Sequence, residues 1–105
     1  MKSIELEIRN PSGLHARPAA MFVRTCGAQK VKVRVRNVTR DTKETDAKSL
    51  LGVLGLGVSS GHRIEITVDG EGEDESLEAI RAAVEAGLGE ALAPEAGAGE
   101  AAAAH

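Results

Sequence analysis

Residues 4–27 read IELEIRNPSGLHARPAAMFVRTCG and contain two hydrophobic periods separated by a turn. Apolar and charged residues alternate over residues 4–9, which predicts a strand with one buried face. The Asn-Pro-Ser-Gly run at residues 10–13 breaks that pattern, and apolar residues then recur at helical spacing until Gly27 ends the helix. The apolar positions of this helix are Ala16, Ala19, Phe22, Val23 and Cys26. The stretch therefore predicts a strand, a turn and an amphipathic helix of about three turns.

Three more strands are expected along the chain. Apolar and polar residues alternate over residues 31–35 and 63–69, so both segments predict half-buried strands. Residues 42–46 are polar and weakly periodic, and we expect them to return as a short edge strand. The basic residues Lys32, Arg34 and Arg36 suit a solvated strand face.

Two more helices complete the predicted fold. The first covers residues 48–56 and is interrupted by Gly52 and Gly55. The second is longer and follows the acidic residues 73–75, whose charge favours a helix N-terminus. Its apolar positions are Leu77, Ile80, Ala83, Val84 and Leu88. The order βαββαβα is typical of an α+β fold, in which one antiparallel or mixed sheet is covered by helices on a single face.

Length and composition favour a single domain over residues 1–92, because a typical domain takes roughly 100–150 residues. Residues 93–105 are dominated by Ala, Gly, Glu and Pro, and we expect a disordered tail there. Cys26 is the single cysteine, so neither an intramolecular disulfide nor a Cys-based metal site can form, and an inert, buried thiol is expected. Because no apolar run approaches the ~20 residues of a membrane span, we expect a cytoplasmic protein.

The charge distribution is strongly asymmetric. Residues 1–48 carry eleven Lys and Arg against five Asp and Glu, a balance of +6, whereas residues 49–105 carry two against eleven, a balance of −9. A protein with both signs can present a basic face to an acidic protein partner. Nucleic acid is the weaker alternative, because aromatic residues make up only 1% of the chain and single-strand binders stack bases on aromatic rings.

Residues 13–20, GLHARPAA, hold the candidate chemistry. His15 stands where the turn meets the helix, whose first backbone amides lack an internal acceptor. Pro18 has no N–H to lose in a first helical turn and so marks the helix start. The positive helix end favours a neutral imidazole that can attack phosphorus, and it then stabilises the anionic product, while Arg17 can contact phosphate oxygens. By spacing alone, a histidine at a helix start is more often a cap or a surface residue than a catalytic one.

This segment resembles the active-site segment of HPr, the histidine phosphocarrier family of the bacterial phosphoenolpyruvate:sugar phosphotransferase system. Residues 48–58, KSLLGVLGLGV, resemble the stretch that opens the family's second helix, and residues 70–75, GEGEDE, resemble the acidic turn before its last helix. The resemblance runs from about Met1 to Glu90. It implies an open-faced β-sandwich with a four-stranded antiparallel sheet and three helices on one face.

The resemblance also implies the chemistry and the partners. His15 would accept a phosphoryl group on Nδ1 from phosphorylated enzyme I and deliver it to a IIA component of a sugar permease. Ala16 and Arg17 would bind the phosphate, and Arg17 would help to bind partners. Phosphoenolpyruvate and Mg²⁺ act on enzyme I, so no cofactor or metal is expected on this chain. Such a carrier, expected to be a monomer, is a phosphotransfer intermediate and not a turnover enzyme by itself.

A partner-binding surface is expected beside His15. On the first helix Arg17, Ala20, Met21 and Arg24 form a second stripe at i, i+3, i+4 and i+7. The second helix has too many leucines for one buried face, and the resemblance implies that the exposed ones are Leu50, Leu51 and Leu54. An apolar patch flanked by arginines suits brief docking with acidic-rimmed proteins. The alternative is that all the leucines are core residues.

Ser49 has two interpretations. In many low-GC Gram-positive relatives the matching serine is phosphorylated by a dedicated kinase that signals carbon status, which makes a serine kinase/phosphorylase a candidate partner. Other members keep the serine without such a kinase, and its role is to cap the second helix. Leu51 and Leu54 stand where low-GC relatives commonly have methionines, which leaves recognition by a kinase open.

The length of one hairpin departs from the family pattern, and the role of His62 is a separate question. The span from His15 to Ser49 is about three residues longer than in typical members, and we place the excess in the hairpin from Asn37 to Thr45. His62 opens a strand without a partner nearby in the sequence, and a surface position is expected for it.

Alternative functions remain open at this point. One is the nitrogen-type branch of the phosphotransferase system, in which the same chemistry serves regulation. Another is a regulatory module that docks enzymes or transcription factors without phosphotransfer, although the presence of both His15 and Arg17 counts against it. An RNA-binding sheet is disfavoured by the lack of aromatic residues.

Overall fold

The computed structural model describes residues 1–90. Its elements follow the order βαββαβα, as predicted. They are β1 (Lys2–Glu7), α1 (Ala16–Gly27), β2 (Lys32–Asn37), β3 (Thr45–Asp46), α2 (Leu50–Gly55), β4 (Arg63–Asp69) and α3 (Glu73–Glu85). The predicted tail at residues 93–105 lies outside the described residues.

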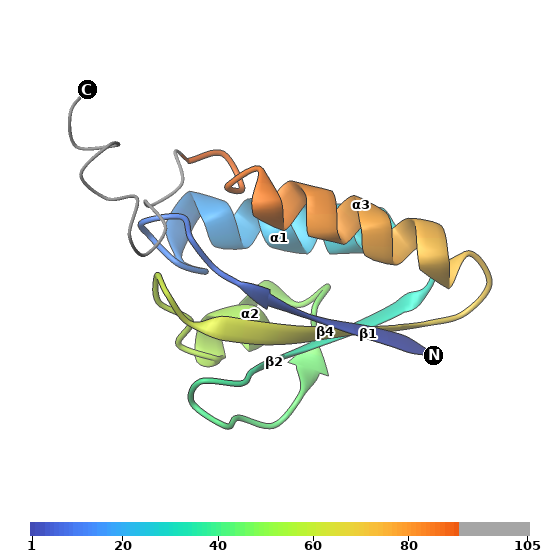
Figure 1. Cartoon of the computed structure of the whole chain (residues 1–105), viewed down its shortest axis with the longest axis horizontal. Coiled ribbons are helices and arrows are strands. Elements are labelled where there is room, and N and C mark those ends of the chain that lie inside the picture. The colour runs from blue at the N-terminus through green and yellow to red at the C-terminus, as the bar shows by residue number, and fades with distance from the viewer. Residues whose placement is uncertain (91–105) are drawn as a thin grey trace.

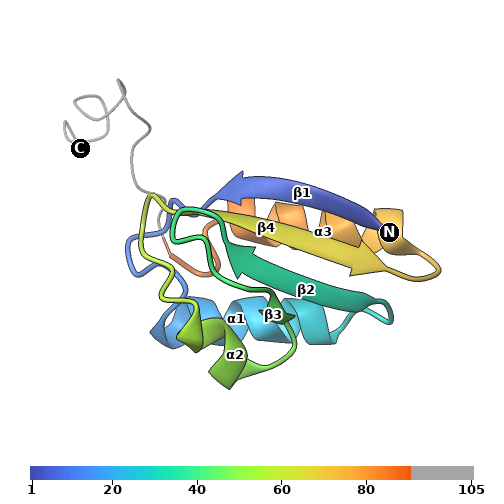
Figure 2. The ribbon, with the colours of Figure 1, turned by 90° about the horizontal axis from the view of Figure 1, so that it is seen from below.

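The strands form one antiparallel sheet in the order β1-β4-β2-β3. Leu6 faces Ile64 and Val35 faces Ile66 across the ladder, so the apolar residues of the three long strands line up in rows. Figure 1 shows α1 and α3 side by side across one face of this sheet, and Figure 2 shows α2 against α1 near β3. The predicted α+β fold with a four-stranded antiparallel sheet is confirmed.

The core lies between the sheet and the helices. The buried strand residues are Leu6, Val33, Val35, Ile64, Ile66 and Val68, and the buried helix residues packed against them include Ala19, Phe22, Cys26, Val53, Ile80 and Val84. Full burial of each large apolar side chain contributes about 1.5–3 kcal/mol. One predicted apolar position of α1 is wrong, because Ala16 is exposed, whereas Val23 is half-buried and packs against the core. Ala16 has a φ of 51°, outside the range of a right-handed helix. Its side chain therefore does not lie on the buried face that the helical spacing predicts.

The other face of the sheet is polar, and its charges are paired. Nε of Arg36 lies 2.9 Å from Oε1 of Glu65, and Nε of Arg63 lies 3.0 Å from Oε1 of Glu5. The pair of Arg34 with Glu44 is longer, at 3.7 Å. The arginines of β2 therefore belong to a solvated, charge-balanced strand face, as predicted.

The end of α3 differs from the prediction. This helix stops at Glu85 and does not continue through Leu88. Residues 87–89 all have positive φ angles, of 95°, 50° and 91°, which a right-handed helix does not allow. Leu88 is nevertheless buried. Its apolar side chain packs into the core from a non-helical segment after α3, not from a further turn of the helix.

The edge strand β3 is also shorter than the predicted 42–46. The Thr42 hydroxyl accepts a hydrogen bond from the Asn37 N–H at 2.9 Å, so Thr42 closes the hairpin turn and does not extend the strand. Within residues 1–90 no helix has the length and apolarity that a membrane crossing requires.

Candidate functional site

His15 occupies the N-cap position of α1. Its backbone is extended, with φ −131° and ψ 162°, and the residue is exposed. The imidazole makes no capping hydrogen bond to the first turn, so the interpretation of His15 as a helix cap is wrong. The ring is available to another molecule at the open end of a helix.

The first turn of α1 leaves hydrogen-bond donors unsatisfied. Ala19 donates the first intrahelical bond, to the His15 carbonyl at 3.4 Å, and Pro18 has no N–H. Within residues 1–90, the N–H groups of Ala16 and Arg17 have no acceptor. The turn contains no acidic residue, and Arg17 is exposed. An anion carried by His15 could therefore accept hydrogen bonds from the free backbone amides. The positive helix end and the Arg17 guanidinium would stabilise its charge.

The loop before His15 is held by the segment that follows α2. The Leu14 N–H donates to the Val58 carbonyl at 3.0 Å, and Nδ2 of Asn10 donates to the Gly13 carbonyl at 2.6 Å. Gly13 has a φ of 61°, and a Cβ there would collide with the Val58 carbonyl oxygen. Glycine is thus required for the close approach. This firm anchoring also supports the positive φ of Ala16, a conformation that costs of order 1–3 kcal/mol.

Glu90 belongs to this site and was missed by the sequence analysis. Its carboxylate accepts hydrogen bonds from the Ser12 N–H at 3.0 Å and from Oγ of Ser12 at 2.8 Å. Those Ser12 hydrogen bonds hold the pKa of Glu90 below its usual value, and Asn10 and the charge of Arg17 add to the effect. Because Ser12 and Glu90 are 78 residues apart, no local sequence pattern identifies the contact.

The predicted stripe on α1 is only partly exposed. Arg17 and Arg24 are exposed, whereas Ala20 and Met21 are half-buried. The sulfur of Met21 lies against Gly89, where an added Cβ would approach it to 2.6 Å. The two arginines are therefore the most accessible part of this stripe.

The leucines of α2 divide as the resemblance implies. Leu50, Leu51 and Leu54 are 44%, 83% and 36% exposed, whereas Val53 and Leu56 are buried. The interpretation of all the leucines as core residues is therefore wrong. Helix α2, which carries these leucines, packs against α1, which carries the arginine stripe (Figure 2). We call the following residues the docking surface, after the partner-binding role that the sequence analysis expects of them: Arg17, Ala20, Met21, Arg24, Leu50, Leu51 and Leu54.

Ser49 is the N-cap of α2, which lies within the predicted range 48–56. Its Oγ accepts a hydrogen bond from the Gly52 N–H at 3.1 Å. The capping role is therefore present in the structure, and it is compatible with a further role in regulation.

His62 is not the surface residue that the sequence predicted. It is half-buried, its Nδ1 accepts a hydrogen bond from the Ser59 N–H at 3.1 Å, and Nδ2 of Asn37 lies 3.2 Å from the same nitrogen. Because both neighbours are donors, Nδ1 of His62 is already occupied as an acceptor. The prediction failed because Asn37 comes from another strand.

Cys26 behaves as predicted. It is fully buried, and this burial raises the pKa of its thiol to about 12. Its nucleophilic thiolate form is therefore not populated near neutral pH.

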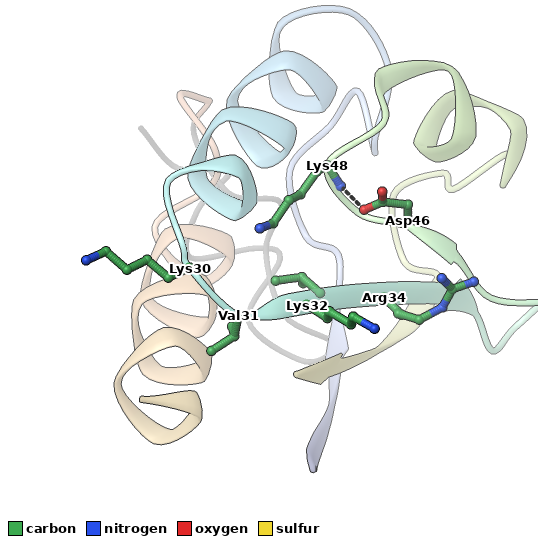
Figure 3. A pocket seen from close by; sticks show the side chains of 7 residues that line it. Lys30, Val31, Lys32, Arg34, Asp46 and Lys48 are labelled. Carbon is green, nitrogen blue, oxygen red and sulfur yellow. Dashed lines mark hydrogen bonds between the residues drawn. The ribbon is translucent and has the colours of Figure 1, made fainter. Parts of the chain in front are cut away.

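A cavity of about 360 Å³ lies past the C-terminal end of α1 (Figure 3). It is lined by Lys30, Val31, Lys32, Val33, Arg34, Asp46 and Lys48. Nζ of Lys48 already donates to the Gln29 carbonyl at 2.8 Å, and the Lys48 N–H donates to Asp46. None of the lining residues belongs to residues 13–20, the segment around His15. In the described part of the chain no group of three or more His, Cys, Asp or Glu residues is arranged to hold a metal ion.

Known proteins share this arrangement. A family model described as the PTS HPr component phosphorylation site matches residues 2–86. The multiphosphoryl transfer protein of Salmonella typhimurium is 42% identical over 88 residues, which are 84% of this chain and only 23% of that protein. The phosphocarrier protein HPr of Mycoplasma pneumoniae is 34% identical over 85 residues, 81% of this chain and 94% of that protein.

The fold comparison agrees with the sequence comparison. A crystal structure of HPr from Thermoanaerobacter tengcongensis matches 88% of this chain and 100% of its own, with a TM-score of 0.81 at 39% identity. The family model covers most of the described residues and includes His15, Arg17 and the α2 leucines. The chain therefore belongs to the HPr family of phosphotransferase-system components.

Proposed function

We propose that this chain is a cytoplasmic phosphocarrier that accepts a phosphoryl group on His15 from phosphorylated enzyme I and donates it to a IIA component. One observation carries the proposal. The imidazole of His15 is exposed and uncapped at the N-terminus of α1, where the amides of Ala16 and Arg17 lack acceptors. A nucleophile and an anion-binding helix end thus meet at one residue.

The proposed transfer exchanges one bond to phosphorus for another. The lone pair on Nδ1 of His15 attacks the phosphorus, and the bond from phosphorus to the donor breaks with its electron pair left on the donor. The anionic product then lies against the Ala16 and Arg17 amides and the Arg17 guanidinium, which stabilise it. The phosphorus–nitrogen bond is labile, so the acceptor protein can take the group in the same way. Phosphoenolpyruvate and Mg²⁺ enter only through enzyme I in this proposal.

The docking surface is proposed to receive both partners in turn. The surface consists of the exposed leucines of α2 together with the exposed Arg17 and Arg24 of α1. Apolar contact supplies affinity, while the arginines steer acidic partners and set the association rate. A small, partly charged surface of this kind suits short-lived complexes of a monomeric carrier.

Within this function we favour the sugar branch, in which the acceptor is the IIA component of a sugar permease. The segment around His15 supports phosphotransfer in either branch, so the nitrogen-type branch is the direct competitor. Purified IIA proteins of both types separate them: the sugar branch predicts faster transfer to a sugar-type IIA. Genes for permease components beside this one would add support.

Regulation at Ser49 is a further part of the proposal. A phosphate on Ser49 would place negative charge beside Leu50 and Leu51 without destroying the helix, since a helix N-terminus accepts an anion. Partner binding would weaken as a result. Incubation with an HPr-type serine kinase should give an acid-stable adduct that is absent from Ser49→Ala.

The central test is incubation of the full chain with phosphoenolpyruvate, Mg²⁺ and enzyme I, followed by intact mass measurement before and after acid treatment. We expect a single added phosphoryl group that acid removes, and no addition to His15→Ala. His62→Gln serves as a control, because it removes another imidazole and should leave the adduct in place. An acid-stable adduct, or an adduct that persists in His15→Ala, would overturn the proposal.

A further inference from the structure

The arginines of residues 1–90 fall into two groups by their partners. Arg34, Arg36, Arg63 and Arg81 all pair with carboxylates, and Arg9 is also engaged. By contrast, Arg17, Arg24 and Arg40 make no ion pair and no side-chain hydrogen bond with any of the described residues. Two of these three belong to the docking surface. The third, Arg40, comes from the hairpin between β2 and β3.

Arg40 lies at the end of α2. Its guanidinium covers Gly57, where an added Cβ would collide with Nη1 and lie 3.3 Å from Cζ. The N–H of Gly57 donates to the Leu54 carbonyl at 3.3 Å, and the next residue, Val58, accepts the hydrogen bond from Leu14. Arg40 therefore covers a backbone segment that is bonded on one side to Leu54 and on the other to the loop that carries His15.

The hairpin that carries Arg40 is firmly built. The Arg40 N–H donates to Oδ1 of Asn37 at 3.2 Å, and Nδ2 of Asn37 donates to the Leu56 carbonyl at 3.1 Å. Asn37 is fully buried. One amide side chain thus ties the backbone of Arg40 to the last residues of α2. Figure 2 shows the hairpin and the segment after α2 running side by side.

A purely structural role does not explain the guanidinium. An arginine can cap the last carbonyls of a helix, but Arg40 donates no side-chain hydrogen bond within residues 1–90. It is exposed and keeps its donors free, although Asp41 is its neighbour in the chain and pairs with Arg36 instead. Free donors on a fixed backbone are suited to a carboxylate from outside.

We propose that Arg40 forms a third cationic edge of the docking surface and binds a carboxylate on the phosphoryl donor, enzyme I. The inference rests on the proposed function. Arg17 and Arg24 belong to α1, which packs against α2, and Arg40 lies over Gly57, just beyond the C-terminal end of α2. The partner that fits has an apolar contact surrounded by acidic residues on more than one side. The lengthened hairpin thus enlarges the contact beyond α1 and α2.

The test compares Arg40→Glu with Lys43→Glu, which makes the same charge change at an exposed lysine of the same hairpin. Initial rates of phosphorylation by enzyme I are measured against the concentration of each full-length chain. We expect Arg40→Glu to raise KM about five- to ten-fold and Arg40→Gln by a smaller factor, with kcat little changed. Lys43→Glu should change KM less than about two-fold, and Arg40→Lys should restore most of the wild-type KM.

Each outcome decides one of the two proposals. A KM for Arg40→Glu near that of wild type, an equal rise in Lys43→Glu, or a fall in kcat at constant KM would overturn the role of Arg40. Thermal unfolding of all variants checks folding, and if Arg40→Glu is unstable, Arg40→Gln and Arg40→Lys supply the comparison. If enzyme I fails to phosphorylate the wild-type chain, the proposed function itself is wrong.

Discussion

Helices α1 and α3 lie side by side on the same face of the sheet, but their N-termini are opposite in character (Figure 1). The first turn of α3 carries Glu73, Asp74 and Glu75, and Glu73 in turn pairs with the Met1 ammonium at 3.0 Å. The first turn of α1 has no acidic residue and no side-chain cap. The positive end of α3 is therefore neutralised by carboxylates of the chain itself, whereas the positive end of α1 has no acidic side chain beside it.

This difference shows how the fold separates stability from chemistry. Negative charge stabilises any helix N-terminus by about 0.3–1 kcal/mol, whether it comes from a side chain or from a ligand. Because α3 supplies its own carboxylates, its end offers nothing to a phosphoryl group. Because α1 supplies none, its end remains open to the anion that the proposed phosphotransfer places on His15.

The largest effect on phosphorylation is expected when one acidic residue, of the kind found in the first turn of α3, is placed in the first turn of α1. Arg17→Glu places a carboxylate where the phosphoryl group must lie and removes the guanidinium, so single-turnover phosphorylation of His15 by enzyme I should slow about 10²–10³-fold. Stability in urea should stay the same or rise by up to about 1 kcal/mol. Arg24→Glu is the matched control further along the helix, and a loss as large as that of Arg17→Glu would contradict the special role of the first turn.

A second change removes the anchoring of the open helix end. Gly13→Ala forces a Cβ into the Val58 carbonyl at a positive φ, and we expect a loss of about 2–4 kcal/mol in the free energy of unfolding. Gly27→Ala is the control, since a Cβ there meets nothing within 4 Å and should be neutral or slightly stabilising. Equal stabilities of the two variants in urea would show that the loop does not need glycine at residue 13.

Glu90 provides a smaller, pH-dependent test. Its pKa is lowered in the folded chain by Ser12, so it stabilises the fold above its ordinary pKa of 4.5, and this contribution is lost as the pH falls through the lower folded value. Glu90→Gln should therefore lower Tm near pH 7, and the difference from wild type should shrink in acid. Glu71→Gln, at an exposed position, should show neither effect. A Tm difference that persists at low pH would contradict the assignment.

The smallest effect concerns the neutralised end of α3. The Glu73 carboxylate raises the pKa of the Met1 ammonium above its usual 8.0, so the pair stabilises the fold below that pH and loses its effect as the pH rises through the folded value. Glu73→Gln should shift the NMR titration of the α-amino group toward lower pH. An unchanged titration would show that the two groups do not interact in solution.

Local patterns predicted most of the fold. Alternation in residues 63–69 gave the bounds of β4, and helical spacing with Gly27 gave the end of α1, because each pattern reflects burial against one neighbouring layer. The same logic, together with the family resemblance, placed His15 at a helix start and left Leu51 on the surface.

Contacts between distant segments were beyond those patterns. Glu90 meets Ser12, His62 meets Asn37, and Arg40 covers Gly57. Each pair joins two segments that are distant in the sequence and that only the folded chain brings together. Ala16 and Leu88 were misjudged for another reason, since their positive φ angles interrupt the helical period at the end of a helix. Sequence periodicity assumes regular backbone, and it fails where the backbone departs from it.

The most direct measurement of the central claim is an NMR comparison of the free and phosphorylated chain, labelled with ¹⁵N. The account predicts a phosphorus–nitrogen coupling at Nδ1 of His15, with the largest amide shifts at Ala16 and Arg17 and none at Glu73 to Glu75. Phosphorus on any other side chain, or unmoved amides at Ala16 and Arg17, would contradict it.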